Sequence, residues 1–204
     1  QVANKTLKSQ QLVKENKPLE GLTDVIQRQS SRLQRLFAQV LDITSMSGYA
    51  LQKEPSNISN LLQEMVDDYR LKTSESNAEI VFVDLADQPA TVSMNPFFFT
   101  TMISNLMENA VKHNHKAEKS IKVGLSEHGN HWQIRLSDNG EGIADKELKL
   151  VFQKFSRSAS NIQSSLGLGL DYVRQCVIAH GWSIEVESIV ELGSTFIIDI
   201  PKNS

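Results

Sequence analysis

The order of predicted helices and strands constrains the fold of this chain more than any single motif does. Apolar side chains recur at helical spacing from Ile58 to Tyr69, which predicts an amphipathic helix. The segments 120–127 and 132–138 alternate apolar and polar residues around a His-Gly-Asn turn signal, which predicts a β-hairpin. Across 56–201 the predicted order is helix, strand, strand, helix, strand, strand, helix, helix, strand, strand. This order indicates a layer of helices on one face of a mixed sheet.

Shorter signals predict the remaining elements of this region. Pro96 is expected to be the first residue of a helix, because a proline there removes an N–H that has no partner inside the helix. Two more helices are expected, one over 144–155 with a ragged end and one that opens on the glycines of 167–169 and ends at Gly181. The remaining predicted strands are 79–85, 183–188 and 194–200.

Residues 1–50 follow a different pattern. Two interleaved series of apolar residues, spaced by sevens with Gln29 filling one position, form a seam of about three heptads, which predicts packing against other helices. The seam consists of Leu22, Ile26, Leu33, Leu36, Val40 and Ile43. Pro18 and Gly21 predict a break between two helices, and 47–56 is interpreted as a linker. The chain has neither an initial Met nor a signal-peptide pattern, so we expect a fragment of a longer protein.

Composition narrows the classes of partner. The chain has 204 residues, of which 40% are apolar, enough for a packed core. A net charge of −3 gives no general attraction to nucleic acid or to an anionic membrane. The only cysteine, Cys176, excludes an internal disulfide, and its apolar neighbours predict a buried structural thiol. No apolar run approaches the roughly 20 residues that a membrane-spanning helix needs.

A polar stripe runs along the predicted helix that contains 105–114. Four polar residues fall at positions i, i+3, i+4 and i+7 and therefore share one face: Asn105, Glu108, Asn109 and Lys112. Amide and carboxylate oxygens suit Mg²⁺, which commonly shares phosphate oxygens, and a lysine one turn away would neutralise phosphate charge. A solvated helix face explains the same spacing, so the stripe alone does not decide between a site and a surface.

Two glycine-containing segments follow downstream. Asp138 ends a predicted strand, where its carboxylate could accept a hydrogen bond from an exocyclic amine, and Gly140 and Gly142 would let a flat ring approach the backbone. A tight turn explains the same residues. Gly167 and Gly169 lie at a predicted helix start, where free N–H groups and the helix dipole favour phosphate, although two glycines alone are a weak signal.

In combination and in this order, these segments resemble the catalytic ATP-binding domain of sensor histidine kinases. That domain belongs to a superfamily shared with gyrase, the heat-shock chaperone ATPases and the mismatch-repair ATPases. The resemblance extends over about 56–201. Four segments resemble the N box, the first glycine box, the F box and the second glycine box of the family, in that order: 105–113, 138–143, 152–155 and 167–181.

The resemblance implies a fold and a division into domains. The implied fold class is α+β, a two-layer α/β sandwich with a mixed sheet of about five strands and three helices, preceded by a partial helical hairpin. Residues 1–50 would be a partial dimerisation and phosphoacceptor hairpin, and 56–204 the catalytic ATP-binding domain. ATP would be held between the N-box helix and a lid.

The resemblance also implies a role for each candidate residue. Asn109 would bind Mg²⁺, Asp138 would accept the adenine amine, and Gly140 and Gly142 would shape the base pocket. A direct metal or proton-transfer role for Glu108 stays open, because the family varies at that position. The residues implied near the phosphates or the metal-bound water are Asn105, Lys112, His113, Arg157, Gly167 and Gly169.

One position favours phosphoryl transfer over hydrolysis. Hydrolysing members of the superfamily have a water-activating Glu four residues before the metal-binding Asn, whereas this chain has Asn105, whose amide has no useful basicity. The expected activity is therefore a protein-histidine kinase. All five histidines lie between His113 and His180, so the family's acceptor motif is absent, and we expect a fragment that binds Mg-ATP without phosphorylating itself.

Two rival functions and several partner expectations follow. Ser165 and Leu166 stand where the family often has a glycine followed by a threonine or serine, which favours a degraded nucleotide-binding scaffold, whereas the intact Asn109, Lys112 and Asp138 oppose it. A serine/threonine kinase of the same superfamily is the second rival. The family implies a response regulator receiver domain as partner, a homodimer of the full-length protein, and no nucleic acid. It also implies a cytoplasmic location, as part of a bacterial sensor anchored to the membrane through segments absent from this chain.

Overall fold

The computed structural model describes residues 51–73, 78–152 and 169–202. The chain divides into two units, Gln1–Gly48 and Tyr49–Ser204, and all of the described residues belong to the second unit. The predicted helical hairpin therefore lies outside the described residues, as do Arg157 and Gly167.

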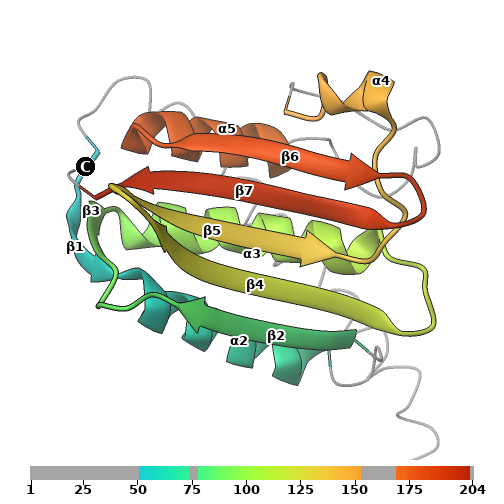
Figure 1. Ribbon diagram of the computed structural model, residues 1–204, viewed down its shortest axis with the longest axis horizontal. Coiled ribbons are helices and arrows are strands. Elements are labelled where there is room, and N and C mark those ends of the chain that lie inside the picture. Colours follow the sequence, from blue (N-terminus) through green and yellow to red (C-terminus); the bar gives the residue numbers. More distant parts are fainter. Residues whose placement is uncertain (1–50, 74–77, 153–168, 203–204) are drawn as a thin grey trace, which may run out of the picture. The chain divides into compact units, whose positions relative to one another are not determined.

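A five-stranded mixed sheet forms one layer of the described unit (Figure 1). Its strands lie in the order β2-β4-β5-β7-β6, in which β2 runs parallel to β4 and the other neighbours are antiparallel. The bounds are β2 Ala78–Leu85, β4 Lys119–His128, β5 His131–Asp138, β6 Ser183–Ile189 and β7 Gly193–Pro201. All five strands were predicted, and the mixed sheet is confirmed.

Three helices form the second layer on one face of this sheet (Figure 1). They are α2 Ile58–Lys72, α3 Pro96–Lys112 and α5 Gly169–His180. The core lies between the layers and is built by alternate residues of the strands, such as Ile121, Val123 and Leu125 of β4, which are fully buried. The predicted α+β fold with a two-layer α/β sandwich is confirmed. None of the helices in the described part of the chain is both long and apolar enough to cross a membrane.

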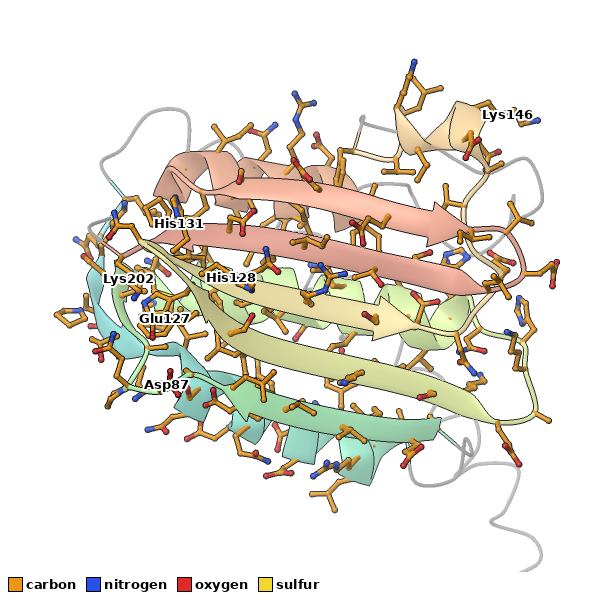
Figure 2. All side chains as sticks on the ribbon, in the orientation of Figure 1. Asp87, Glu127, His128, His131, Lys146 and Lys202 are labelled. Atoms are coloured by element: carbon orange, nitrogen blue, oxygen red, sulfur yellow. The ribbon has the colours of Figure 1, made fainter. Side chains whose placement is uncertain are left out.

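The predicted hairpin joins β4 to β5 through Gly129 and Asn130. His128 and His131 are opposite each other in the register, and Gly129 has a φ of 58°, which a glycine adopts without strain. At this end of the sheet Lys202 pairs with Glu127, and its ammonium lies 4.6 Å from the centre of the Trp132 ring (Figure 2). The pair and the cation–π contact close the core where the hairpin turns.

A small second sheet was missed by the sequence reading. Strand β1, Glu54–Asn57, pairs antiparallel with β3, Thr91–Met94, so the end of the predicted linker 47–56 is a strand. Both strands are four residues long. Strand β1 shows no alternation of apolar and polar residues, whereas β3 does alternate, with Val92 and Met94 buried, but is too short to stand out in the sequence. The backbone N–H of Ile58 then donates to the carbonyl of Ala90 at 2.9 Å, which fixes the start of α2 beside β3.

Helix α3 begins at Pro96, as predicted. Asn95 caps it, because its side-chain oxygen accepts the Phe98 N–H at 3.1 Å. The apolar face of α3 is buried under the sheet, and the helix ends at Lys112 with the His113 N–H bonded to the Asn109 carbonyl at 2.9 Å. This helix therefore runs from the edge of the small sheet to the end of β5.

The prediction of a helix over 144–155 is mostly wrong for 144–152, the part of this segment that the structure describes. Only Asp145–Leu148, α4, is helical, and turns follow as far as Phe152. Ala144 provides no side-chain cap, and none of the α4 residues is buried. A short helix without a cap or a buried face has little to stabilise it beyond its first turn.

Candidate functional site

The polar stripe of α3 lies on the less buried side of the helix. Asn105, Asn109 and Lys112 are half-buried, whereas Glu108 is exposed. The Asn105 side-chain amide donates to the carbonyl of Thr101 at 2.8 Å, which orients the amide group. The stripe is therefore accessible along the C-terminal half of α3, as a ligand site requires.

The N-terminus of α5 meets this stripe. A Cβ added to Gly169, the first residue of α5, would lie 3.1 Å from the side-chain oxygen of Asn105. That separation is tight for a carbon, so the glycine allows the start of α5 to lie close to the stripe. The structure thus brings together two candidate residues that are 64 positions apart in the sequence (169 − 105).

The loop after β5 packs against the C-terminal end of α3. Its Glu141 N–H donates to the His113 carbonyl at 3.0 Å, and the Gly140 N–H donates to the Asp138 carboxylate at 2.8 Å. A Cβ on Gly140 would lie 2.5 Å from the same His113 carbonyl. Glycine is required here because the backbones of the loop and of the helix end approach so closely.

Gly142 and Gly193 join this loop to the turn between β6 and β7. Gly142 has a φ of 69°, and a Cβ there would lie 2.2 Å from the carbonyl oxygen of Ile189. Gly193 has a φ of 119°, and a Cβ there would lie 1.9 Å from the carbonyl oxygen of Asp138. The space next to these glycines is filled by protein backbone, a packing role that the sequence reading missed. The predicted contact of Gly140 and Gly142 with a base stays a prediction.

Asp138 is a half-buried carboxylate of the site. Burial raises the pKa of the Asp138 carboxyl, while hydrogen bonds from the Gly140 and Ser194 N–H groups and the nearby His113 lower it and Glu141 raises it. A desolvated carboxylate that still accepts backbone hydrogen bonds is held ready to receive a further donor from a ligand. A shifted carboxyl beside an imidazole is also typical of functional sites.

His113 forms an ion pair with a residue that the sequence reading did not select. Its ring Nδ1 lies 2.8 Å from Oε1 of Glu141, and Nε2 of His115 lies 3.9 Å from the other oxygen of the same carboxylate. Glu141 lies inside the predicted glycine box, but it is 28 positions from His113 (141 − 113), so no local pattern relates the two.

A second missed pair joins the same segments. Asn114 is fully buried, and its side-chain amide donates to the Asn139 side-chain oxygen at 2.7 Å. That oxygen also accepts the Ser120 N–H at 2.8 Å, and the Asn139 amide donates to the Glu118 carbonyl at 3.0 Å. The two asparagines fix the loop after β5 relative to the end of α3 and the start of β4.

A comparison with known protein families identifies the family of this chain. Residues 94–204, more than half of the chain, match the family described as histidine kinase-, DNA gyrase B-, and HSP90-like ATPase. The chain belongs to this ATPase family. The match covers the described candidate residues of α3, of the loop after β5 and of α5.

Sensor proteins are among the curated sequences that are similar to this chain. The sensor protein SrrB of Staphylococcus aureus is 28% identical over 183 residues, 87% of this chain and 31% of SrrB. The adaptive-response sensory kinase SasA of Synechococcus elongatus is 27% identical over 191 residues, 92% of this chain and 49% of SasA. The chain therefore spans between about a third and a half of the length of these relatives.

Solved structures of histidine kinases share the fold. Full-length ShkA in complex with AMPPNP superposes with a TM-score of 0.72 at 22% identity, over 83% of this chain and 36% of ShkA. The mycobacterial sensor histidine kinase MprB gives 0.63 at 25% identity, over 73% of this chain and 97% of that chain. The catalytic domain of histidine kinase ThkA gives 0.63 at 23% identity, over 74% and 97%. The two-layer arrangement is thus the fold of histidine kinase catalytic domains.

The structure brings the described candidate residues together in two groups. Asn105 lies against Gly169, and His113 lies beside Asp138 and Gly140. In residues 51–73, 78–152 and 169–202 no group of three or more His, Cys, Asp or Glu side chains is placed to hold a metal. The stripe instead offers the amide oxygens of Asn105 and Asn109, hard ligands of the kind that Mg²⁺ accepts when phosphates and water complete its coordination.

Proposed function

We propose that this chain contains the ATP-binding domain of a two-component sensor histidine kinase, which binds Mg-ATP and donates the γ-phosphoryl group to a histidine on a helical hairpin. One observation supports this function most strongly. The polar stripe of α3 ends at Lys112, and the next residue, His113, acts electrostatically on the half-buried carboxylate of Asp138. A buried acceptor for a base beside a polar face for phosphates is what an adenine nucleotide requires.

The roles proposed for the site residues come from the family resemblance, and the geometry supports them. Asp138 accepts a hydrogen bond from the adenine amine, since burial leaves its carboxylate poorly solvated. Asn109 would hold Mg²⁺, which when bound would offset the charge of the phosphates. Lys112 and His113 lie at the end of α3 and are proposed to contact the phosphates. Gly169 allows the N–H groups at the start of α5 to face the phosphates. Arg157 and Gly167 are proposed as further phosphate contacts by the family resemblance alone.

The stripe also supports transfer over hydrolysis. Asn105 has an amide where a hydrolase needs a carboxylate, and this amide already donates to the Thr101 carbonyl. Glu108 is exposed and lies about 100° around the helix from Asn109, so it is poorly placed to activate water beside the metal. ATP bound in this site would therefore be conserved for a protein acceptor.

The acceptor and the partners belong to the same proposal. Residues 1–50 contain no histidine, so we place the acceptor histidine outside this chain and expect no autophosphorylation of it. Residues 1–50 would be part of the dimerisation hairpin, and 56–204 the catalytic domain. The full-length protein would form a homodimer and pass its phosphoryl group to the receiver domain of a response regulator.

A transfer assay tests this function. The chain is mixed with γ-labelled ATP, Mg²⁺ and a separate helical hairpin that contains an acceptor histidine. The expected result is label on the hairpin that is lost in acid, with none on the chain itself. An acid-stable label would indicate a serine or threonine kinase. Calorimetry without any heat of Mg-ATP binding would indicate a scaffold that has lost the nucleotide.

A further inference from the structure

Glu141 joins three segments at the edge of the proposed site. Its N–H donates to the His113 carbonyl at 3.0 Å, and its own carbonyl accepts the Glu191 N–H at 2.8 Å. These bonds connect the loop after β5 to the end of α3 and to the turn between β6 and β7. The backbone of Glu141 is thus held independently of what its side chain does.

The side chain of Glu141 has one close partner. Its carboxylate lies 2.8 Å from Nδ1 of His113, with both side chains about one-third exposed, at 34% for the histidine and 35% for the glutamate. His115 is a weaker partner, because the distance is 3.9 Å and its side chain is 70% exposed. A carboxylate acceptor at Nδ1 places a proton on that nitrogen and fixes the plane of the ring, so that Nε2–H of the doubly protonated ring could donate to another group.

The charges around His113 could either strengthen or weaken nucleotide binding. Two carboxylates, Asp138 and Glu141, act electrostatically on each other and on this imidazole, and the Lys116 ammonium bonds to the Glu191 carbonyl nearby. A carboxylate next to a triphosphate would repel it, so deleting Glu141 would strengthen nucleotide binding if charge alone mattered. If Glu141 orients His113, its deletion would weaken binding. The partial exposure of Glu141 screens its charge, which favours the orienting effect.

We propose that Glu141 is a positioning residue for nucleotide binding, which holds the His113 imidazole so that Nε2 faces the phosphates of the nucleotide. This proposal rests on the proposed function, because it needs a nucleotide in the site. It explains why the glycine box has a charged residue between Gly140 and Gly142, where a turn requires none.

A double-mutant cycle on Mg-ATP affinity tests the proposal. We expect Glu141→Ala and His113→Ala each to weaken binding about twofold to fivefold, the range of a partly exposed ion pair, and the double variant to lose no more than either single variant. Glu141→Gln should restore most of the affinity, since its side-chain oxygen still accepts from Nδ1–H. His115→Ala and Glu185→Ala are the matched controls, because they remove the same groups at a more exposed position, and both should bind like the wild type.

Two results would overturn the proposal. One is additive losses in the cycle, which indicate a merely structural role for Glu141. The other is tighter binding by Glu141→Ala, which indicates that only its charge matters. If the variants do not fold, ¹⁵N NMR of the wild-type imidazoles replaces the cycle. Nδ1 of His113 should then be protonated, and in the presence of Mg-ATP Nε2 should be protonated as well, because only Nε2–H can donate to a phosphate oxygen. An Nε2 resonance that Mg-ATP leaves unchanged rejects the proposal.

The variant Asp138→Asn distinguishes a failure of the proposed function from a failure of the role proposed for Glu141. If the wild type binds Mg-ATP and this variant does not, the proposed function is supported. Additive losses in the double-mutant cycle would then reject only the role proposed for Glu141. If the wild type does not bind Mg-ATP, or if Asp138→Asn binds equally well, the proposed function fails and the role of Glu141 fails with it.

Discussion

Helix α3 has a histidine contact at each end, and the two histidines are held in opposite ways. At the N-terminal end His180 is 2% exposed, its Nε2 accepts the Asn95 N–H at 3.1 Å, and its Nδ1 donates to the Cys176 carbonyl at 2.7 Å. At the C-terminal end His113 is one-third exposed and its Nδ1 faces the carboxylate of Glu141. The first histidine has both nitrogens occupied by the protein, whereas the second has one left for a ligand.

The N-terminal end is a structural contact between helices. The Trp182 ring lies 4.4 Å from the His180 ring and meets Phe99 of α3 edge-on at 6.3 Å, so aromatic packing surrounds the imidazole. The Lys53 ammonium donates to the His180 carbonyl at 3.2 Å, which brings in the segment before β1. Burial lowers the pKa of His180, a backbone bond to Cys176 raises it, and Lys53 lowers it. His180 is therefore neutral at pH 7 and fixes the two helices to each other.

The difference shows that residue type does not decide whether a histidine has a structural or a ligand-binding role. Its burial and the number of its hydrogen-bond partners in the protein decide the role. The buried end sets the distance between α3 and α5, and at the other end the same two helices bring Asn105 and Gly169 together. If the comparison is correct, substitutions at the site end should change ligand binding, and substitutions at the buried end should mainly change stability.

The largest predicted effect is at the glycine that joins the site loop to the β6–β7 turn. Gly193→Ala would place a Cβ 1.9 Å from the Asp138 carbonyl oxygen at a φ of 119°, so we expect a loss of about 4 kcal/mol of unfolding free energy in urea denaturation. Gly129→Ala is the matched control. It also has a positive φ, of 58°, but no atom lies within 4 Å of the added Cβ, so about 1 kcal/mol is expected. Equal losses would refute the close packing at Gly193.

Removal of the buried histidine should have the next largest effect. His180→Ala loses two hydrogen bonds and aromatic packing, and we expect about 3 kcal/mol of destabilisation in the same urea experiment. His128→Ala, at the exposed hairpin, should change stability by less than about 0.5 kcal/mol. A loss of nucleotide affinity by His180→Ala in the folded protein, without a loss of stability, would contradict the division between the two ends.

The pH dependence of the unfolding free energy tests whether His180 is buried as described. The pKa of His180 is lower in the folded protein than its ordinary value of 6.5, so the unfolded chain takes up this proton first. The stabilisation by neutral His180 is complete above pH 6.5 and is lost as the pH falls from 6.5 toward the folded value. Unfolding free energies measured over this range should fall less steeply for a folded His180→Asn variant than for the wild type. Parallel slopes would show that this imidazole is not buried as described.

Asp138 should show the opposite sign and the smallest effect on stability. Its folded pKa is raised, so the ionised carboxylate costs stability above that pKa, and this cost is relieved as the pH falls toward the ordinary value of 3.8. Relative to Asp138→Asn, the wild type should therefore gain stability as the pH is lowered. A wild type that instead loses stability relative to the variant over this range would indicate a carboxylate stabilised by its hydrogen bonds more than it is penalised by burial.

The sequence predicted the elements with strong local patterns and missed those that depend on distant contacts. The β4–β5 hairpin and the start of α3 at Pro96 follow from alternation and from a proline that fits only one end of a helix. Strand β1 and the short extent of α4 do not, because they depend on pairing with β3 and on burial that the local sequence does not encode.

The residues of the candidate site divide in the same way, into those that could be predicted from the sequence and those that depend on distant contacts. The polar stripe, Asp138 and the glycines could be selected from the sequence, since their types and order resemble those of a known family. The contacts of Glu141 with His113 and of Asn139 with Asn114 could not, since each joins residues from separate elements. The roles assigned to the stripe, to Asp138 and to Arg157 and Gly167 stay predictions.

The most direct test of the account is a calorimetric titration of the chain with ATP in the presence of Mg²⁺. The wild type, Asn109→Ala and Asp138→Ala are compared, with Glu185→Ala as the control on the exposed face of β6. The account predicts binding by the wild type and by Glu185→Ala, and a loss of affinity of at least about tenfold in each of the two site variants, equivalent to about 1.4 kcal/mol. Equal affinity in all four proteins, or no binding by the wild type, would contradict it.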